Sequence, residues 1–375
     1  MKKIHMVDLK GQYNKIKPQI DQAIQTVIDN TAFINGPEVK AFAAELEQHL
    51  GIPYVIPCAN GTDALQIAMM ALNLKPGDEV ITANFTYVAT AEVIALLGLK
   101  PVLVECNPDT FCIDPAAIEK AISPKTKAIV PVHLFGQCAD MEPITEIANR
   151  HNLFVIEDTA QAIGATYTFS DGTKKPAGGI GHVGTTSFFP SKNLGCYGDG
   201  GAIFTTDETL AKRIRMIANH GQSVQYVHDD IGVNSRLDTI QAAILRVKLQ
   251  HLDEYSAARV AVADAYDKAF ANHPNLVTPK RAANSTHVFH QYTVQLKGAD
   301  RAALKEYLTS KEIPMMVYYP LPLHMQKAYA DARYNEGDFP ITEELCKTVF
   351  SLPIHTEMDS ETQNYIIESV LTFFK

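Results

Sequence analysis

The chain has 375 residues, 46% of them hydrophobic, and a formal net charge of -9 at pH 7. This composition is typical of a soluble globular protein with a sizeable core, and the length suggests two to three domain-sized units, or one large domain with a smaller partner. The acidic balance argues against nucleic acid or an anionic membrane as the main partner, because both recruit basic surfaces. No stretch approaches the roughly 18 uninterrupted apolar residues of a membrane span, and the first residues contain no signal-type apolar core, so we expect a cytoplasmic protein.

Potential metal ligands and nucleophiles form no recognisable cluster. The six cysteines include no C-x-x-C pair, so reduced thiols are expected. The histidines at positions 133, 182, 220, 228 and 324 have no second ligand three or four residues away, which disfavours a metal site. G-x-S-x-G is absent, and the glycines after position 194 meet neither the Walker nor the dinucleotide spacing.

The first 72 residues predict an arm, two helices and a candidate phosphate site. A polar arm should lead into helices over 15–30 and 37–50, with a turn at 34–37 between them. Small residues then open a helix whose apolar positions 64, 65, 68, 71 and 72 share one face. Gly61 and Thr62 lie where the free amides and the helix dipole attract phosphate. On this motif alone, an ordinary N-cap without a ligand is the more common arrangement.

Residues 78–157 alternate strand and helix patterns. Continuous apolar strands separated by helices indicate a parallel sheet buried on both faces. In such sheets ligands lie beyond the carboxyl ends of the strands, which places Thr86, Tyr87 and Asp158 where a cofactor would lie. We expect strands at 79–82, 101–104, 127–132 and 153–157, and helices at 87–97, 114–122 and 140–151.

The second half should begin with a helix over 207–218 and an irregular loop over 221–233. Asp238 with Gln241 fits a capping box that starts a long helix running through Leu252. Beyond it, a strand near 288–296, a helix near 300–310 and a final helix after Asp359 suggest a compact α+β unit. We therefore divide the chain into a large domain over 1–253 and a small C-terminal domain over 254–375.

The most informative stretch is 187–201, a Ser/Gly-rich turn that contains Lys192. Glycines at 195, 198, 200 and 201 allow the backbone to approach a ligand closely. Pyridoxal phosphate needs a lysine for the Schiff base, an acid for the pyridine nitrogen, and hydroxyls and amides for the phosphate. Lys192, Asp158 and Ser187 provide these groups, so we interpret Lys192 as the Schiff-base lysine.

Two of these residues have a competing structural interpretation. Asp158 could merely cap the next helix, although its combination with Lys192 favours a contact with the cofactor, which Gln161 would also reach. Tyr87 could belong to the core or stack on the pyridine ring, and the sequence favours neither.

Five motifs together resemble the DegT/DnrJ-type sugar aminotransferases, which are fold-type I pyridoxal phosphate enzymes. They occur in family order over essentially the whole chain, and a sixth, at 319–324, extends the match. The five motifs are residues 60–65, 85–90, 157–161, 187–192 and 232–238. The resemblance implies an α/β fold with a mostly parallel sheet between helices in the large domain and a smaller α+β domain.

The resemblance also implies roles for individual residues. Lys192 would bind the cofactor and later move the proton, while Asp158 would pair with the pyridine nitrogen and Gln161 with the ring hydroxyl. Some relatives carry histidine at the lysine position and catalyse a dehydration, so Lys192 argues for transamination. The implied phosphate ligands are Gly61, Thr62 and Ser187, joined by Asn234 from the second subunit of a homodimer.

Within the family, the amino-acid sequence of residues 58–67, 191–201 and 220–222 is similar to one branch. Its members use L-glutamate to aminate the C3 ketone of UDP-linked 2-acetamido-3-oxo-glucuronic acid, for O-antigen. Tyr318 departs from the histidine of that branch. The residues expected to contact substrate are Arg236, Tyr318, Tyr319 and His324. Two alternatives stay open: a C4 aminotransferase for a UDP- or dTDP-linked 4-keto-6-deoxy sugar, and a cofactor-binding regulator without turnover.

Overall fold

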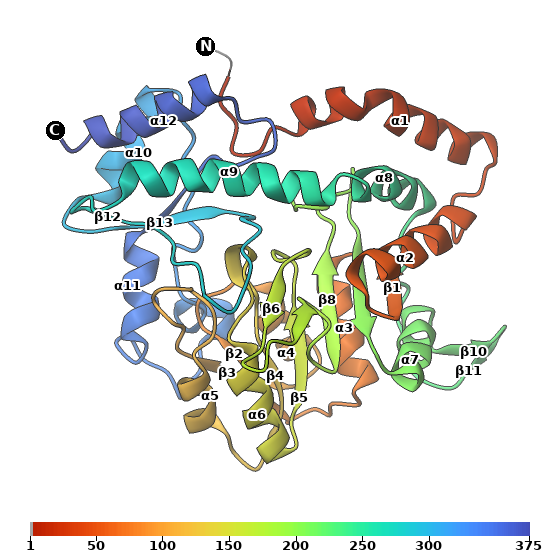
Figure 1. The fold of residues 1–375 in the computed structure, drawn as a ribbon. Helices are drawn as coiled ribbons and strands as arrows, with labels where there is room; N and C mark the ends of the chain where they lie inside the picture. The colour runs from red at the N-terminus through yellow and green to blue at the C-terminus, as the bar shows by residue number, and fades with distance from the viewer. Residues whose placement is uncertain (1–2) are drawn as a thin grey trace.

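A seven-stranded sheet forms the centre of the computed structural model, which describes residues 3–375 (Figure 1). Its order is β1-β9-β8-β5-β4-β2-β3. The strands from β8 to β3 pair in parallel, whereas β9 is antiparallel to both of its neighbours. The strands are β1 (Tyr54–Cys58), β2 (Glu79–Ala83), β3 (Lys100–Val104), β4 (Thr126–Val130), β5 (Phe154–Asp158), β8 (Val183–Ser187) and β9 (Gly201–Thr205).

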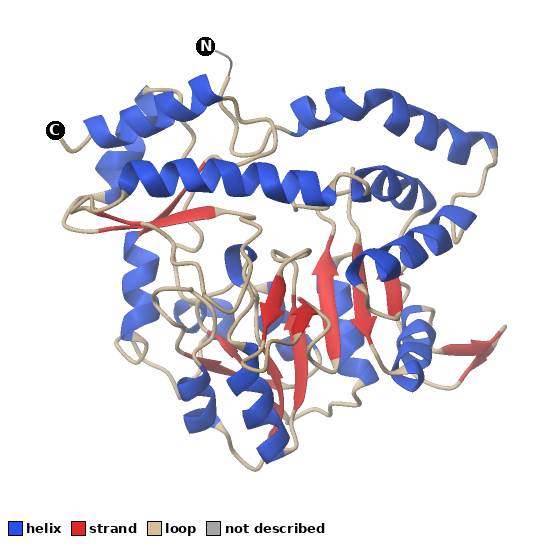
Figure 2. Cartoon of the chain, in the orientation of Figure 1, coloured by secondary structure: helices blue, strands red, loops and turns tan. Residues whose placement is uncertain are grey.

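Helices cover both faces of this sheet (Figure 2). Successive residues of a strand point to opposite faces, so Ala128 packs toward α3, α4 and α7 while its neighbour Ile129 packs toward α5 and α6. Burial on both faces explains the continuous apolar strands in the sequence. The helices are α3 (Gly61–Ala71), α4 (Ala89–Leu96), α5 (Pro115–Ala121), α6 (Met141–His151) and α7 (Glu208–Ala218).

The predicted fold class is confirmed, and the four strands and three helices expected between 78 and 158 are present within a few residues. The loop expected at 221–233 instead contains a small hairpin, β10 (Gln222–Val224) with β11 (Val227–His228). A second hairpin, β6 (Thr166–Thr168) with β7 (Lys174–Pro176), lies between β5 and β8 and was not predicted.

The prediction of a capping box at the start of α8 (Thr239–Leu249) was wrong. Asp238 precedes the helix but makes no side-chain capping bond. The Gln241 side-chain oxygen instead accepts a hydrogen bond from the Tyr197 amide at 2.8 Å. This bond holds the turn that follows Lys192. The prediction of a single long helix through Leu252 was also wrong, because α8 ends at Leu249 and a separate helix, α9 (Leu252–Phe270), follows.

The division between α8 and α9 follows from what each helix packs against. Leu245 of α8 packs with Phe42 of α2 (Pro37–Leu50), and Ile244 packs with Ile20 of α1 (Leu9–Asp29). Helix α9 instead runs toward the three-stranded sheet on the other side of the molecule, where Tyr266 is fully buried (Figure 1). Only the first residue of α9, Leu252, shares the apolar cluster of Leu245, whereas the later part of α9 packs in the C-terminal core.

The C-terminal part contains an antiparallel three-stranded sheet of β12 (Leu276–Val277), β13 (Tyr292–Leu296) and β14 (Val349–Leu352). The strand predicted near 288–296 forms only from Tyr292. Three helices accompany this sheet: α10 (Arg301–Ser310), α11 (Pro340–Thr348) and α12 (Ser360–Thr372). Its core also contains Ile4 from the N-terminal arm, and the boundary after residue 253 stays a prediction.

Across residues 3–375, every helix is too short or too polar to cross a lipid bilayer.

Ile129 tests the position of the core. It is fully buried in β4, so Ile129→Ala should lower the free energy of unfolding by about 2–5 kcal/mol through lost burial and the cavity left behind. Urea denaturation followed by circular dichroism measures the loss. The control is Leu96→Ala, whose side chain is 71% exposed and whose loss should stay within about 0.5 kcal/mol. Equal losses in the two variants would place Ile129 outside the core.

Candidate active site

The start of α3 lies against the end of β8. A Cβ atom on Gly61 would come within 2.7 Å of the Ser187 Cβ, so only glycine fits there without a shift. Asn60 caps the helix by accepting a hydrogen bond from the Asp63 amide at 2.8 Å. The structure thus places Gly61, the first residue of α3, beside Ser187, and Thr62 follows it in the same turn. Helix amides and a hydroxyl at one point form a site suited to phosphate.

The turn between β8 and β9 holds Lys192. It is closed by hydrogen bonds from the Lys192 amide to the Phe189 carbonyl and from the Cys196 amide to the Phe188 carbonyl, both 2.8 Å. The Asn193 side-chain amide also donates to the Val288 carbonyl at 2.9 Å. These bonds fix the backbone on both sides of the lysine.

Two lysines in this region have a strongly lowered pKa. Burial lowers the pKa of Lys192 to about 8, and the negative charge of Asp158 partly opposes that shift. Burial lowers the pKa of Lys248 to about 8 as well, but its ammonium group donates to the Gly195 carbonyl and lies 5.4 Å from the Tyr197 ring centroid. Within residues 3–375, Lys192 has no hydrogen bond from its amino group. Of these two lysines, Lys192 is therefore the one whose amino group is not already engaged by a carbonyl.

Asp158 ends β5, and its side chain is 8% exposed. One carboxylate oxygen accepts from the Thr90 hydroxyl at 3.0 Å, and the other accepts from the Ala160 amide at 3.1 Å. The helix-capping alternative was wrong, because β5 is followed by turns and then by β6. The contacts instead hold a nearly buried carboxylate whose charge acts on Lys192.

Gln161 has a fixed orientation beside two tyrosines. Its side-chain oxygen accepts from the Phe135 amide at 2.7 Å, which leaves the NH₂ group to donate to the Tyr319 hydroxyl at 3.2 Å. Tyr87 precedes α4 and is 57% exposed, with its ring centroid 6.2 Å from that of Tyr319. Tyr318 is half-buried next to Tyr319. The exposed face of Tyr87 can therefore stack on a flat ligand.

Asn234 and Arg236 lie on either side of a residue that anchors their segment. Between them, the buried Ser235 accepts a hydrogen bond from the Ala59 amide at 3.0 Å, just before α3 begins. Asn234 is exposed and Arg236 is half-buried. In the described part of the chain, neither side chain forms a hydrogen bond or an ion pair.

His324 lies in a separate buried cluster. Its Nδ1 is 2.7 Å from the side-chain amide of Asn84, its backbone amide donates to the Asn84 oxygen at 3.0 Å, and its Nε2 is 3.3 Å from a Glu343 oxygen. These contacts fasten the loop after Tyr319 to the end of β2. Asn84 contacts Nδ1, whereas the buried Nε2 has no hydrogen-bond partner among the described residues although a Glu343 oxygen lies nearby. Direct substrate contact by His324 stays a prediction.

Comparison with known proteins identifies the family. The DegT/DnrJ/EryC1/StrS aminotransferase family matches residues 14–371. This chain belongs to that family. The predicted family is thereby confirmed, and the chain is an aminotransferase.

Individual members of the aminotransferase family match this chain over almost its whole length. The UDP-2-acetamido-2-deoxy-3-oxo-D-glucuronate aminotransferase of Pseudomonas aeruginosa is 48% identical over 95% of this chain and 96% of its own. A protein of Geobacillus stearothermophilus named pleiotropic regulatory protein is 46% identical over 99% of both chains. The X-ray structure of Streptomyces venezuelae DesV in complex with a ketimine intermediate superimposes with a TM-score of 0.95, at 38% identity, over 100% of this chain and 99% of that one.

Sequence reasoning did not find several residues that shape this aminotransferase site. Thr90 lies in the motif at 85–90 but was assigned no role, and nothing in the sequence signalled Asn84 or Phe135. Their contacts join residues 26 to 240 positions apart, and two of them use backbone amides. Neither spacing nor residue type reveals a backbone donor.

The lowered pKa of Lys192 gives the first test of the site. In the cofactor-free protein, a reagent that attacks neutral amines should modify Lys192 with a midpoint near pH 8, well below the ordinary lysine value of 10.5. Asp158→Asn should move the midpoint to lower pH, because a charge that favours the ammonium form is removed. Peptide mass spectrometry across a pH series measures both. A midpoint near 10.5, or a rise in the Asp158 variant, would contradict this environment.

Proposed function

We propose that this enzyme transfers an amino group from L-glutamate to the C3 ketone of UDP-2-acetamido-2-deoxy-3-oxo-glucuronic acid. The observation that carries the proposal is the 48% identity, over nearly the full length, to an aminotransferase named for this sugar. Arg236, which has no partner in the described chain, adds support, because a guanidinium group can bind the carboxylate of a uronic acid through two parallel hydrogen bonds. The product would enter O-antigen or another surface polysaccharide made in the cytoplasm.

The cofactor is pyridoxal 5'-phosphate, and the described residues fit it. Gly61 allows the start of α3 to lie against Ser187, and Gly61, Thr62 and Ser187 would hold the phosphate there. The pyridine nitrogen would meet Asp158 and the ring hydroxyl Gln161, with Tyr87 against the ring face. When bound, the cofactor supplies an electron sink for the carbon that loses its proton.

The chain's own groups divide the remaining work. Lys192 must be neutral to act as a nucleophile or to accept a proton at its nitrogen, and its burial favours the neutral amine. The two hydrogen bonds to Asp158 hold its carboxylate in one orientation, so that its negative charge favours a protonated pyridine nitrogen. With the same lysine accepting and returning the proton, the two half-reactions can share one site.

We infer a homodimer with shared active sites. Asn234 and Arg236 would reach the partner's site, which accounts for two polar side chains without partners in their own chain. Arg236 would bind the sugar carboxylate, with Tyr318 and Tyr319 beside it. Neither a nucleic acid nor a membrane is expected among the partners.

Two alternatives predict different results. A C4 aminotransferase would place the new nitrogen at C4 of a 4-keto-6-deoxy sugar, which product NMR distinguishes. A regulator without turnover is suggested by the name of the Geobacillus relative. The family match spans residues 14–371 and includes Lys192, which leaves little of the described chain for a separate DNA-binding module.

Lys192→Ala tests the proposed catalysis. The variant should fold, lose turnover and lack the absorption band of lysine-bound cofactor, because no equivalent lysine lies in the turn behind Ser187. Transfer of nitrogen from ¹⁵N-glutamate to the 3-oxo-uronate, followed by NMR, measures turnover and the position aminated. The control is Lys75→Ala, a change at an exposed lysine that should retain both. If Lys192→Ala kept the absorption band of lysine-bound cofactor and wild-type turnover, the proposed role of Lys192 would be disproved.

Arg236→Ala tests the uronate assignment. Loss of a two-pronged carboxylate contact should raise the Michaelis constant for the uronate sugar at least about tenfold, the equivalent of ~1.4 kcal/mol. The glutamate half-reaction should change less, unless Arg236 also receives the donor's carboxylate. Single-turnover kinetics separate the two half-reactions.

The matched control for that experiment is Arg150→Ala, which removes a surface ion pair with Glu119 and should leave both half-reactions unchanged. Equal, minor effects of Arg236→Ala on both half-reactions would remove Arg236 from the site.

A further inference from the structure

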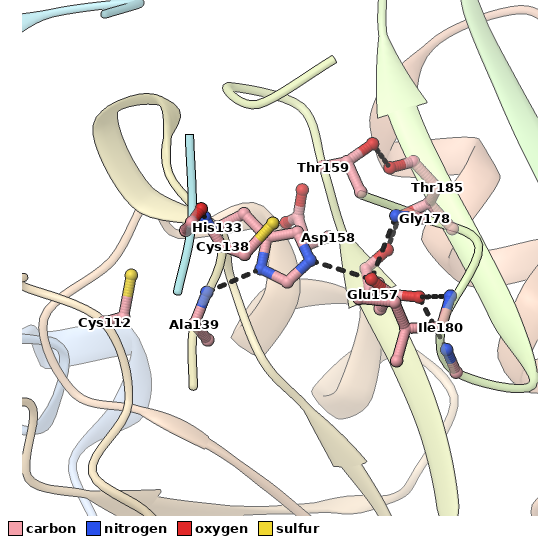
Figure 3. A network of polar contacts seen from close by, with 12 residues as sticks. Cys112, His133, Cys138, Ala139, Glu157, Asp158, Thr159, Gly178, Ile180 and Thr185 are labelled. Atoms are coloured by element: carbon pink, nitrogen blue, oxygen red, sulfur yellow. Dashed lines mark hydrogen bonds and ion pairs between the residues drawn. The ribbon is translucent and has the colours of Figure 1, made fainter. Parts of the chain in front are cut away.

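Glu157, the neighbour of Asp158 on β5, is a fully buried acid. Its carboxylate accepts hydrogen bonds from the amides of Gly178, Ile180 and Gly181 at 2.9, 2.7 and 2.6 Å (Figure 3). The His133 ring supplies a fourth contact, from Nε2 at 2.9 Å. A buried carboxylate normally destabilises a fold, and four donors offset that cost. None of these contacts belongs to the site described above.

His133 links this acid to the site in two ways. Its Nδ1 accepts a hydrogen bond from the Ala139 amide at 3.0 Å, so Nδ1 carries no hydrogen and Nε2 is the donor to Glu157 (Figure 3). The His133 backbone amide donates to the Asp158 carbonyl at 3.0 Å. One residue therefore contacts both members of the acidic pair that ends β5.

The loop that His133 closes also orients Gln161. Its contact with the Ala139 amide joins the two ends of residues 133–139. Within the loop, Phe135 has a φ of +60°, a conformation that few side chains adopt. That backbone presents the Phe135 amide to the Gln161 oxygen at 2.7 Å. If the loop relaxed, Gln161 would lose the contact that directs its NH₂ group toward Tyr319.

We propose that His133 and Glu157 form a positioning pair that holds Asp158 and Gln161 in place for the cofactor. This proposal rests on the proposed function, in which those two residues contact the pyridine nitrogen and the ring hydroxyl. Glu157 fixes the end of β5 from the face opposite Asp158, and His133 fixes the loop that orients Gln161. The pair touches neither cofactor nor substrate.

Two substitutions separate the contacts of His133. His133→Gln can keep a donor near Glu157 but loses the acceptor for Ala139, whereas His133→Asn can keep the acceptor but not the reach to Glu157. Each should raise the dissociation constant of pyridoxal phosphate about tenfold or more, as the loss of outer-shell partners does at metal sites. Each should also shift the pH dependence of the bound cofactor's absorption.

Cofactor-free protein provides an independent measurement. Hydrogen exchange of residues 133–139 should be slow in the wild type and faster in both variants. The control is Tyr266→Phe, which removes a buried hydrogen bond to the Pro353 carbonyl in the C-terminal core. It should lower the unfolding midpoint without changing cofactor affinity, absorption or exchange at 133–139.

The outcomes distinguish this proposal from the proposed function. A folded His133 variant with wild-type affinity and absorption would overturn the positioning pair, provided that Asp158→Asn changes both. Wild-type exchange at 133–139 as fast as that of a free loop would overturn it without any variant. If Asp158→Asn itself left affinity and absorption unchanged, the assignment of Asp158 would fail instead.

Discussion

The charge of Asp158 acts on a lysine whose burial favours its neutral form. Burial lowers the pKa of Lys192, and the Asp158 carboxylate partly restores it, so that the resulting pKa is about 8. Both groups depend on backbone geometry: Asp158 on the end of β5, and Lys192 on a closed turn between β8 and β9. Because β5 and β8 are hydrogen-bonded neighbours, the sheet itself brings the acid and the lysine turn together.

Several elements far apart in the chain preserve this arrangement. Thr90, in the first turn of α4, donates a hydrogen bond to one carboxylate oxygen of Asp158. Gln241 of α8 holds the turn after Lys192, and Lys248 of the same helix binds the Gly195 carbonyl. Helix α8 directly follows the segment that carries Arg236. The helix that fixes the lysine turn thus also fixes the start of the proposed substrate-binding segment.

The sequence predicted those parts of the fold that depend on local patterns. Strands β2 to β5 are continuous apolar runs because both of their faces are buried, and helix periodicity located α4 to α6. Lys192, Asp158 and Ser187 could be selected because their chemical types match one cofactor. The helix start at Gly61 was also readable locally, but the reason for glycine there is the close approach of the distant Ser187.

The remaining features could not be predicted because their causes are distant. Gln241 looked like part of a capping box, but its partner is the Tyr197 amide, 44 residues earlier. The break between α8 and α9 reflects two different packing surfaces, which the uniform helical pattern did not reveal. The contact of the His324 ring with Asn84, 240 residues away, was likewise not foreseen, and substrate contact by His324 stays a prediction.

The most direct test of the central claim is to locate the covalent bond between the cofactor and the protein. Reducing the purified holoenzyme with sodium borohydride and mapping its peptides by mass spectrometry would show which lysine carries the cofactor. The account predicts the added mass on the peptide containing Lys192 and unmodified Lys248, the other buried lysine whose pKa is lowered to about 8. Cofactor on Lys248 or on any other lysine would contradict it.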